Sequence, residues 1–474
     1  MKLAKESILF KALQKFGTLA AIILFSGGVS VLSLNPVAIL IVLTGALSLV
    51  GLTAFWEYLV WKNYSFFFEE KNLNIEHGVL RKKHREIPLS RIQNVDIQRN
   101  IFERIFGIAV VSLETAGGNT TEASLKYVDL ETGRDIQKKF RRLKKGDNLE
   151  QSEEAEQRDL IFELEPKELL LLGLTSVNTR VVFGLFALIG LAGGALGSAV
   201  EGAGISLAAA ISIIGVIGIF TTVTGSFVTN ILRYFDFKLY RVEDSLEFER
   251  GLLNRSEGSI PLEKIQKLTV EENPLKRFFG YSTLKIETAG YSAEQSMQQG
   301  AESAIPLAER ERVVEFARMI EGFENFELNQ VSKRARRRYF GRYMIVVGLI
   351  TLGSLGYSLI SNSGLWYWPL VLTPVAGLAA HLKWANKGYS PGEKYFISMN
   401  GFWKRQTMIT PYYRIQNLIE TQTVLQRRWK LSTLTLDIAG SNPFQQDAKV
   451  SDLDQEIVKQ LRKEVFRKFQ SVIR

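Results

Sequence analysis

Three copies of one eleven-residue pattern constrain this chain more than any other feature of its sequence. The copies read IPLSRIQNVDI at 87–97, IPLEKIQKLTV at 260–270 and TPYYRIQNLIE at 410–420. Around each copy a glycine lies ten residues before the proline, a glutamine five after it, and an arginine eleven after the glutamine. The landmark residues are Gly78, Pro88, Gln93, Arg104, Gly251, Pro261, Gln266, Arg277, Gly401, Pro411, Gln416 and Arg427. Such equal spacing indicates a domain-sized module that is present three times.

The third copy departs from the other two where a turn is expected. Gly107 and Gly280 follow the landmark arginine by three residues, and each should allow a turn that a side chain would obstruct. Lys430 stands at the same position in the third copy. Either the turn tolerates a side chain, or the third module is distorted there.

Each module is predicted to consist of about seven short strands and one closing helix. Apolar residues alternate in NLNIEHGVL (72–80) and SLEFERGLL (245–253), which is typical of strands that lead into a glycine turn. Apolar residues recur with a helical period at 130–143, 307–320 and 452–469.

Six apolar runs have the length of a membrane span and form three pairs with short connections. The first pair runs from Thr18 to near Phe55, the second from Val181 to near Val228, and the third from Tyr343 to near Ala380. Hydrophobic residues make up 46% of the chain and charged residues 23%, which suits membrane spans that alternate with water-soluble domains.

The placement of charge predicts the topology. Lysine and arginine flank the outer ends of every pair, whereas the connections within pairs carry almost no charge. Positive charge near span ends stays on the cytoplasmic side. We therefore expect a multi-pass protein of the cell membrane in which both termini and all three modules face the cytoplasm.

The alternation of hairpin and module resembles a known family of membrane proteins. The segments IPLxRIQxV, RxFG at 104–107 and ETAGG at 114–118 are similar to the bacterial pleckstrin-homology (PH) type 2 module, formerly described as a domain of unknown function. The resemblance implies a bent antiparallel sandwich or barrel that is capped by the helix. It also implies a smaller companion membrane protein with the same module. It implies little about activity, because one fold serves many roles.

We therefore predict an α+β membrane protein with six transmembrane helices in three hairpins, each followed by a PH-like β-sandwich or barrel module with a C-terminal helix. The segment LEPKELLLLGLTS (164–176) is predicted to be a helix that lies in the interface or packs on the adjacent module. The predicted divisions are hairpin 1 at 1–62, module 1 at 63–146, a linker at 147–160, the interfacial segment with hairpin 2 at 161–232, module 2 at 233–325, a basic flank with hairpin 3 at 326–386, and module 3 at 387–474.

The landmark residues are interpreted as structural. A glutamine on an apolar strand face should bond to neighbouring backbone groups, and contact with a ligand is the alternative. Arg81, Lys82, Lys83 and Arg85 form a basic run that is a candidate contact for anionic lipid. Gly193 and Gly197 form a GxxxG pattern in the third predicted span, which indicates close helix packing.

The sequence offers little for catalysis or metal binding. The chain has no cysteine and three histidines, so disulfides are excluded and neither a zinc site nor a cofactor is expected. Glu114 and Glu287 begin the two ETAG segments, but they lie in different copies and no nucleophile is near either. No nucleic-acid-binding motif is present, and the net charge of +10 is explained by the membrane flanks. We do not expect an enzyme.

The expected function is that of a membrane-anchored scaffold or adaptor. Its expected partners are membrane lipids, contacted through their headgroups, and a smaller membrane protein with the same module. The expected setting is an envelope-stress or antimicrobial-resistance system. The alternative is a component of a lipid or peptide transport or flippase assembly. Transport pathways usually place ionisable residues inside the membrane, and the interiors of the six predicted spans contain none.

Overall fold

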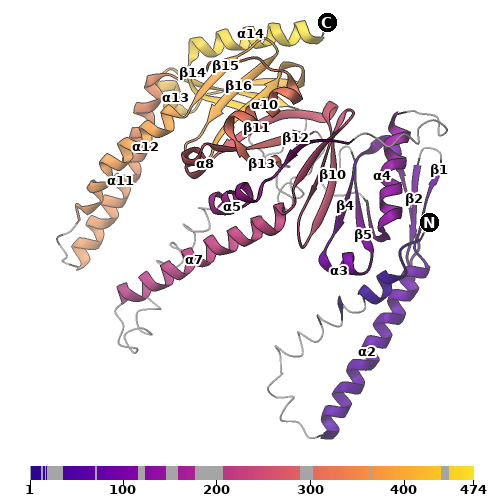
Figure 1. Ribbon diagram of the computed structural model, residues 1–474. Coiled ribbons are helices and arrows are strands. Elements are labelled where there is room, and N and C mark those ends of the chain that lie inside the picture. Colours follow the sequence, from indigo (N-terminus) through magenta and orange to yellow (C-terminus); the bar gives the residue numbers. More distant parts are fainter. Residues whose placement is uncertain are drawn as a thin grey trace. The chain divides into compact units, whose positions relative to one another are not determined.

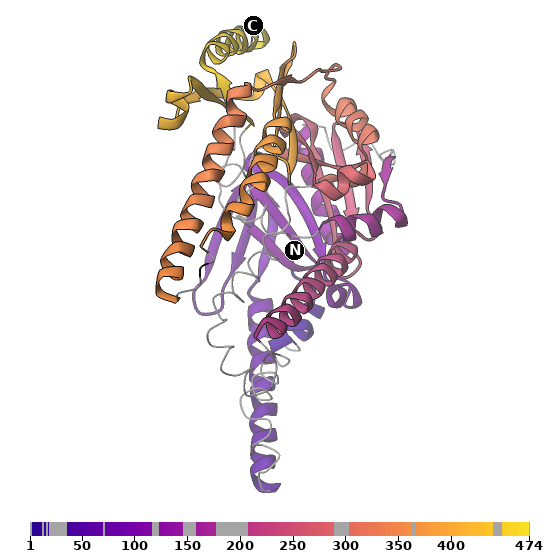
Figure 2. The same cartoon turned by 90° about the vertical axis from the view of Figure 1, so that its left-hand side faces the viewer.

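The computed structural model describes residues 2–11, 14–15, 18, 36–69, 72–115, 123–145, 158–176, 207–288, 303–361, 364, 366–438 and 448–473. Within them the protein is a mixed α+β structure with antiparallel strand pairs (Figures 1 and 2). The chain divides into two compact units, Met1–Glu163 with Leu232–Pro261, and Leu164–Ile231 with Leu262–Arg474. Each unit contains one three-stranded and one seven-stranded sheet.

The first module packs two sheets around one core. Phe66 and Leu73 from its first sheet are buried together with Ile97 from its second, and Ile136 of α4 adds to the same cluster. Helix α4 packs against β4 and β5 (Figure 1). The elements are β1 (Ser65–Glu69), β2 (Asn72–His77), β3 (Lys83–Pro88), β4 (Ile92–Arg99), α3 (Ile101–Ile105), β5 (Ile108–Thr115), β6 (Ala123–Asp129) and α4 (Leu130–Lys145). The described part of this module thus has six strands and the predicted closing helix.

The seven-stranded sheet of the first unit joins strands from two modules in the order β6-β5-β4-β10-β9-β8-β7. Its remaining strands are β7 (Asp159–Glu163), β8 (Lys238–Val242), β9 (Ser245–Arg250) and β10 (Arg255–Pro261). Strand β4 of the first module lies beside β10 of the second, so the sheet is continuous from one module to the next.

The second unit repeats this arrangement. Its large sheet has the order β13-β12-β11-β17-β16-β15-β14, in which β11 of the second module lies beside β17 of the third. A separate sheet contains β18, β19 and β20. The elements are β11 (Ile265–Glu272), α8 (Pro274–Phe279), β12 (Tyr281–Thr288), β13 (Ser303–Glu309), α10 (Arg310–Glu321), β14 (Asn329–Gln330), β15 (Gly388–Pro391), β16 (Tyr395–Asn400), β17 (Arg405–Pro411), β18 (Ile415–Thr421), α13 (Val424–Arg428), β19 (Leu431–Ile438), β20 (Ala448–Asp454) and α14 (Gln455–Ile473).

Two of these strands are separated in sequence from the strand that they pair with by a whole predicted hairpin. Strand β7 comes before the second predicted hairpin and pairs with β8, which comes after it. Strand β14 comes before the third and pairs with β15. The predicted divisions placed neither strand in its module. Strand β7 has five residues and β14 has two, and both are too short to be recognised as strands in the sequence.

Three glycine turns have the same strained geometry. Gly78, Gly251 and Gly401 have φ of 125°, 105° and 94°, a region that L side chains rarely adopt. A Cβ on Gly78 or Gly251 would lie 2.0 Å from the carbonyl oxygen three residues later, so these positions require glycine.

The lysine of the third copy adopts the conformation of the glycines that it replaces. Lys430 has φ of 54°, beside 68° for Gly107 and 79° for Gly280. In each module the carbonyl of this residue accepts a hydrogen bond from the first residue of the closing helix. The turn therefore tolerates a side chain, and the third module keeps the geometry of the other two at this turn.

Two of the described helices are long and apolar enough to cross a membrane. They cover Gly215–Tyr234 within α7 (Leu207–Tyr234) and Lys333–Ile360 within α11 (Lys333–Ser361), and they match the fourth and fifth predicted spans. Helix α2 (Pro36–Lys62) covers the second. The first and third predicted spans, with Gly193 and Gly197, lie outside the described residues.

The sixth predicted span is not a continuous α-helix. It contains the 3-10 turn Trp368–Leu372 and then α12 (Thr373–Ala385), in whose first turn Pro374 lies. Proline lacks the backbone N–H that a helix interior needs, which explains why the α-helix begins there. Helices α11 and α12 run side by side (Figures 1 and 2).

The segment at 164–176 forms the predicted helix, α5 (Pro166–Thr175). It lies against β13, and Asn273 donates a hydrogen bond to the carbonyl of Thr175. Gly173 faces the ring of Phe227 in α7 so closely that a Cβ would lie 2.5 Å from it. Of the two alternatives for this segment, the structure favours packing on the adjacent module.

Lys430→Gly should stabilise the protein. A non-glycine residue with this φ lowers the free energy of unfolding by roughly 1 kcal/mol, and glycine removes that cost. At Gly107 and Gly280, the equivalent positions, no atom lies within 4 Å of where a Cβ would be, so the side chain has no packing role there. We expect an apparent melting temperature higher by about 2–4 °C in detergent. Lys449→Gly, in the strand interior, is the control and should lower it; an unchanged or lower value for Lys430→Gly would show that the lysine is not strained.

Candidate functional site

The described residues contain no group of three or more His, Asp or Glu side chains that could hold a metal ion. Glu287 forms an ion pair with buried Lys267 at 2.9 Å, which gives it a structural role. The side chain of Glu114 lies outside the described residues. The most distinctive surfaces of the molecule are instead the junctions where modules share a sheet.

Two strand pairs build these junctions. We call β4, β11 and β18 the receiving strands, since each begins the second sheet of its module, and β10 and β17 the docking strands. In the first junction Arg255 lies opposite Arg99, and in the second Arg405 lies opposite Glu272. These positions are equivalent in the repeat, so both junctions have the same register. Backbone pairing of two sheet edges is the usual mode of strand addition.

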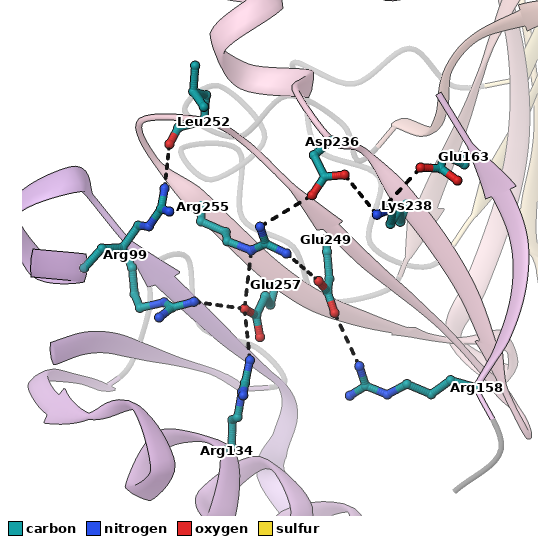
Figure 3. Close-up of polar contacts among 11 residues, drawn as sticks. Arg99, Arg134, Arg158, Glu163, Asp236, Lys238, Glu249, Leu252, Arg255 and Glu257 are labelled. Atoms are coloured by element: carbon teal, nitrogen blue, oxygen red, sulfur yellow. Dashed lines mark hydrogen bonds and ion pairs between the residues drawn. The ribbon is translucent and has the colours of Figure 1, made fainter. Parts of the chain in front are cut away.

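Oppositely charged side chains face each other across the first junction. Glu257 of the docking strand lies 3.3 Å from Arg99 of β4 and 3.6 Å from Arg134 of α4 (Figure 3). Arg255 forms an ion pair at 2.7 Å with Glu249 on the neighbouring strand β9 (Figure 3). Here the receiving side is basic and the docking strand supplies the acid.

The second junction has the opposite polarity. Glu272 of the receiving strand is almost fully buried and lies 2.7 Å from Arg405 of the docking strand. Glu271 lies 3.1 Å from Lys404 and 3.0 Å from Lys285. Burial opposes the ionisation of Glu271, but these two lysines outweigh it and lower the pKa of Glu271 to about 2. The acids are now on the receiving strand, and the bases that reach them across the junction are Arg405 of the docking strand and Lys404 directly before it.

The landmark arginines reach across both junctions. Arg104 donates to the carbonyl oxygen of Leu252 at 2.8 Å, and Arg277 donates to that of Phe402 at 2.7 Å. Leu252 and Phe402 each follow the landmark glycine of the next module. The guanidinium of Arg277 also lies over the Phe402 ring. The repeat pattern predicted a structural role for these arginines, but it did not indicate that they bind the following module.

The landmark glutamines occupy the second residue of each receiving strand. Gln266 is buried and donates to the carbonyl of Lys264 at 3.4 Å. Gln416 is exposed, and the side chain of Gln93 lies outside the described residues. Gln266 thus makes the kind of backbone contact that was predicted. No such contact is present for Gln416 among the described residues.

The receiving strand of the third module borders a groove. It measures about 380 Å³ and is lined by residues 415–418 of β18 and by five residues of α14: Arg462, Lys463, Val465, Phe466 and Phe469. Thr269 in the middle of β11 is 2% exposed, whereas its counterpart Ile419 in β18 is 44% exposed. Unlike β4 and β11, β18 has no strand beside its outer edge within the described residues.

The candidate lipid contacts lie around the glycine turn of the first module. Arg81 and Lys82 are in the turn, and Lys83 and Arg85 are in β3, all of them exposed. Leu80 at the same turn is 90% exposed. His84 lies between Glu86 at 3.0 Å and Glu76 at 3.3 Å, and the hydrogen bond to Glu86 raises its pKa.

A buried polar network ties the base of α11 and the end of α12 to the third module. Asp452 pairs with Arg338 at 2.9 Å and accepts a hydrogen bond from Gln426 at 2.8 Å. Lys387 donates to the Tyr339 hydroxyl at 2.7 Å, and that hydroxyl donates to Asp452. Burial lowers the pKa of Lys387 to about 8, although nearby Asp452 opposes the shift. A broken buried ion pair is strongly destabilising, so this network should fix the module to the helices.

Comparison with known proteins agrees with the repeat. The family model described as "Bacterial PH domain" matches residues 15–144, 182–323 and 345–469, which is three copies and most of the chain. The chain belongs to this family. It is 25% identical over 438 residues to the "UPF0699 transmembrane protein YdbT" of Bacillus subtilis (strain 168), with 87% of each chain covered. The predicted family and the threefold repeat are confirmed, and the protein is a membrane protein with bacterial PH domains.

The second junction should depend on pH through Glu271. Because its folded-state pKa of about 2 lies below the ordinary 4.5, Glu271 contributes stability above pH 4.5 that is lost as the pH falls toward 2. Glu271→Gln should lower the free energy of unfolding by about 2–3 kcal/mol at pH 6. We expect the difference from wild type to shrink at lower pH, as measured by thermal unfolding.

Glu327→Gln is the matched control, since Glu327 is exposed and forms no ion pair in the described part of the chain. It should behave as wild type at every pH. A deficit of Glu271→Gln that stays constant from pH 6 to pH 3 would contradict this account of the junction.

Proposed function

We propose that the chain is a membrane-anchored scaffold whose bacterial PH modules bind other proteins by strand addition. The observation that carries this proposal is the pair of junctions β4–β10 and β11–β17, which share one register but have opposite charge polarity. Modules that repeatedly associate through sheet edges, with side-chain charges setting which edges match, have the properties that an assembly platform needs. The proposal requires no catalytic step, metal or cofactor.

The membrane arrangement belongs to the same proposal. Six helices in three hairpins would hold all three modules and both termini at the cytoplasmic face. Helices α7 and α11 and the transmembrane relative support spans, and the lysine and arginine flanks support the orientation. Exposed Leu80, together with Arg81, Lys82, Lys83 and Arg85, would suit an anionic lipid surface, where an apolar side chain inserts and the basic groups meet headgroups.

The orientation can be tested with reporter fusions. Fusions after Asp147, Gln330 and Arg474 should all be active with a cytoplasmic reporter, and insertions in the hairpin connections near Asn35 and Ser363 should be active with an external one. External activity at any of the first three positions would contradict the three-hairpin arrangement.

The scaffold function predicts a stable protein partner. The chain, purified from its native membrane in mild detergent and cross-linked before extraction, should carry a second membrane protein in a fixed ratio. A chain with the hairpins intact and all three modules removed is the control and should lose that protein. If the wild-type chain were recovered without a second membrane protein after cross-linking and purification, that result would contradict a scaffold function.

A further inference from the structure

The third module repeats the geometry of a filled junction without an occupant among the described residues. Strand β18 is the counterpart of β4 and β11, and the β18-β19-β20 sheet ends at it. Arg427 is the counterpart of Arg104 and Arg277, and its side chain is exposed with no hydrogen-bond partner in the described part of the chain. The strand edge and the arginine that bind the following module at the two filled junctions are therefore both present at an edge that no described strand occupies.

The groove beside β18 corresponds to a surface that the second junction covers. Glu321, near the end of α10, accepts a hydrogen bond from the Tyr395 hydroxyl of the third module. The Tyr395 ring also contacts Phe323, with centroids 6.3 Å apart. Counting from the start of the closing helices, Phe466 of α14 holds the position of Glu321, and it is 52% exposed. An occupant of this groove would bury Phe466 as the third module buries the end of α10.

The surroundings of the open edge are basic. Arg427 and Arg428 lie on α13, and Lys459, Arg462 and Lys463 are exposed on α14. Lys459 holds the position of Arg134, which meets Glu257 in the first junction. Glu420 is the single acid of β18, and it lies 3.8 Å from Arg462. Since each filled junction sets opposite charges against each other, this edge matches a docking strand that carries acid.

The chain's own free docking edge has the wrong charge for this site. Strand β3 is equivalent to β10 and β17, and it forms one edge of its three-stranded sheet. Lys83, His84 and Arg85 are exposed on it, at the positions of Ser256, Glu257 and Gly258 in β10. Pairing β3 of one copy with β18 of another would set basic groups against basic groups. Head-to-tail growth through two complementary edges, which would produce filaments, is thereby disfavoured.

We propose that β18 and α14 of the third module form a docking site for an acidic, extended strand of another protein. The strand would pair with β18 in the register of the two internal junctions, place an acidic side chain at the position of Glu257 near Lys459, and set an aliphatic side chain against Leu418 and Phe466. Arg427 would donate to a backbone carbonyl of the occupant. This site rests on the proposed scaffold function and names the surface that would bind the partner.

A peptide taken from the chain's own acidic docking strand is a suitable probe. It contains residues 252–263 with S259I, which places isoleucine where β17 has Ile409. The full-length protein in detergent should bind the labelled peptide saturably, as measured by fluorescence anisotropy. Peptide E257K and a peptide of residues 79–90 from β3 should bind at least tenfold more weakly, since both place a base opposite basic groups.

The site variants compare two neighbouring arginines. Arg427→Ala should weaken peptide binding roughly tenfold, because a charged donor to the occupant is lost. Arg428→Ala removes the same charge at a position without the landmark role, and should weaken binding much less. Both residues are exposed, so neither change should alter the melting temperature. Equal binding by wild type and Arg427→Ala, or by the E257K peptide and its parent, would overturn the proposal.

Because the natural chain has no cysteine, cross-linking can test the register directly. Ile419→Cys should form a disulfide with the peptide that carries G258C, since the equivalent residues Thr269 and Met408 are partners in the second junction. Trp403→Cys, at an exposed turn, is the negative control, and Thr269→Cys with Met408→Cys is the positive one. Equal reaction of the peptide at Ile419→Cys and Trp403→Cys would overturn the register.

A second copy of the chain is the rival occupant. The variant with Ile419→Cys and Arg85→Cys would form disulfide-linked dimers if β3 of another copy occupied the edge, and that result would overturn the proposal of an acidic partner. We expect monomers under the same conditions. If the peptide fails to bind while a membrane protein still co-purifies with the chain, the docking site is wrong and the scaffold function stands.

Discussion

The organisation of this protein depends on backbone hydrogen bonding between the edges of sheets. In a lone module the docking and the receiving strand would each present unpaired N–H and C=O groups along one edge, and such edges associate readily. In the chain the second edge of one module is paired with the first edge of the next, so each junction removes two edges at once. Among the described strands, the two junctions leave one docking strand, β3, and one receiving strand, β18, without a neighbour on that edge.

Charge then decides which edges match. The backbone pairing is the same at both junctions and offers no selectivity, whereas Glu257 facing Arg99 and Glu272 facing Arg405 give the junctions opposite polarity. Exchanging the docking strands would leave Arg99 without Glu257, because Thr407 holds the equivalent position in β17. It would also bring Glu257 close to the buried, acidic Glu272 in the second junction. Like charges held together at a buried contact cost more than the correct pairs contribute, so the order of the modules is encoded in a few side chains.

Much of the fold could be predicted from the sequence, because the repeat contains residues whose backbone conformation few other residue types can adopt. Gly78, Gly251 and Gly401 need their left-handed φ, and the closing helices show a clear helical period. The junctions could not be derived in this way, because Arg104 and Leu252 are far apart in the chain and no local pattern connects them. One signal was present: the landmark arginine recurs in all three modules with an invariant spacing to the turn that follows.

The pairing of β7 with β8 has a consequence for biosynthesis. These two strands are neighbours in one sheet, yet the whole of the second predicted hairpin separates them in the chain. In the proposed membrane arrangement, the sheet can be completed only when both ends of that hairpin emerge on the same face of the bilayer. Strand β14 and β15 set the same condition for the third hairpin. A hairpin that inserted only one of its helices would leave an incomplete sheet with an unpaired strand edge. Completion of these sheets would thereby depend on correct membrane insertion.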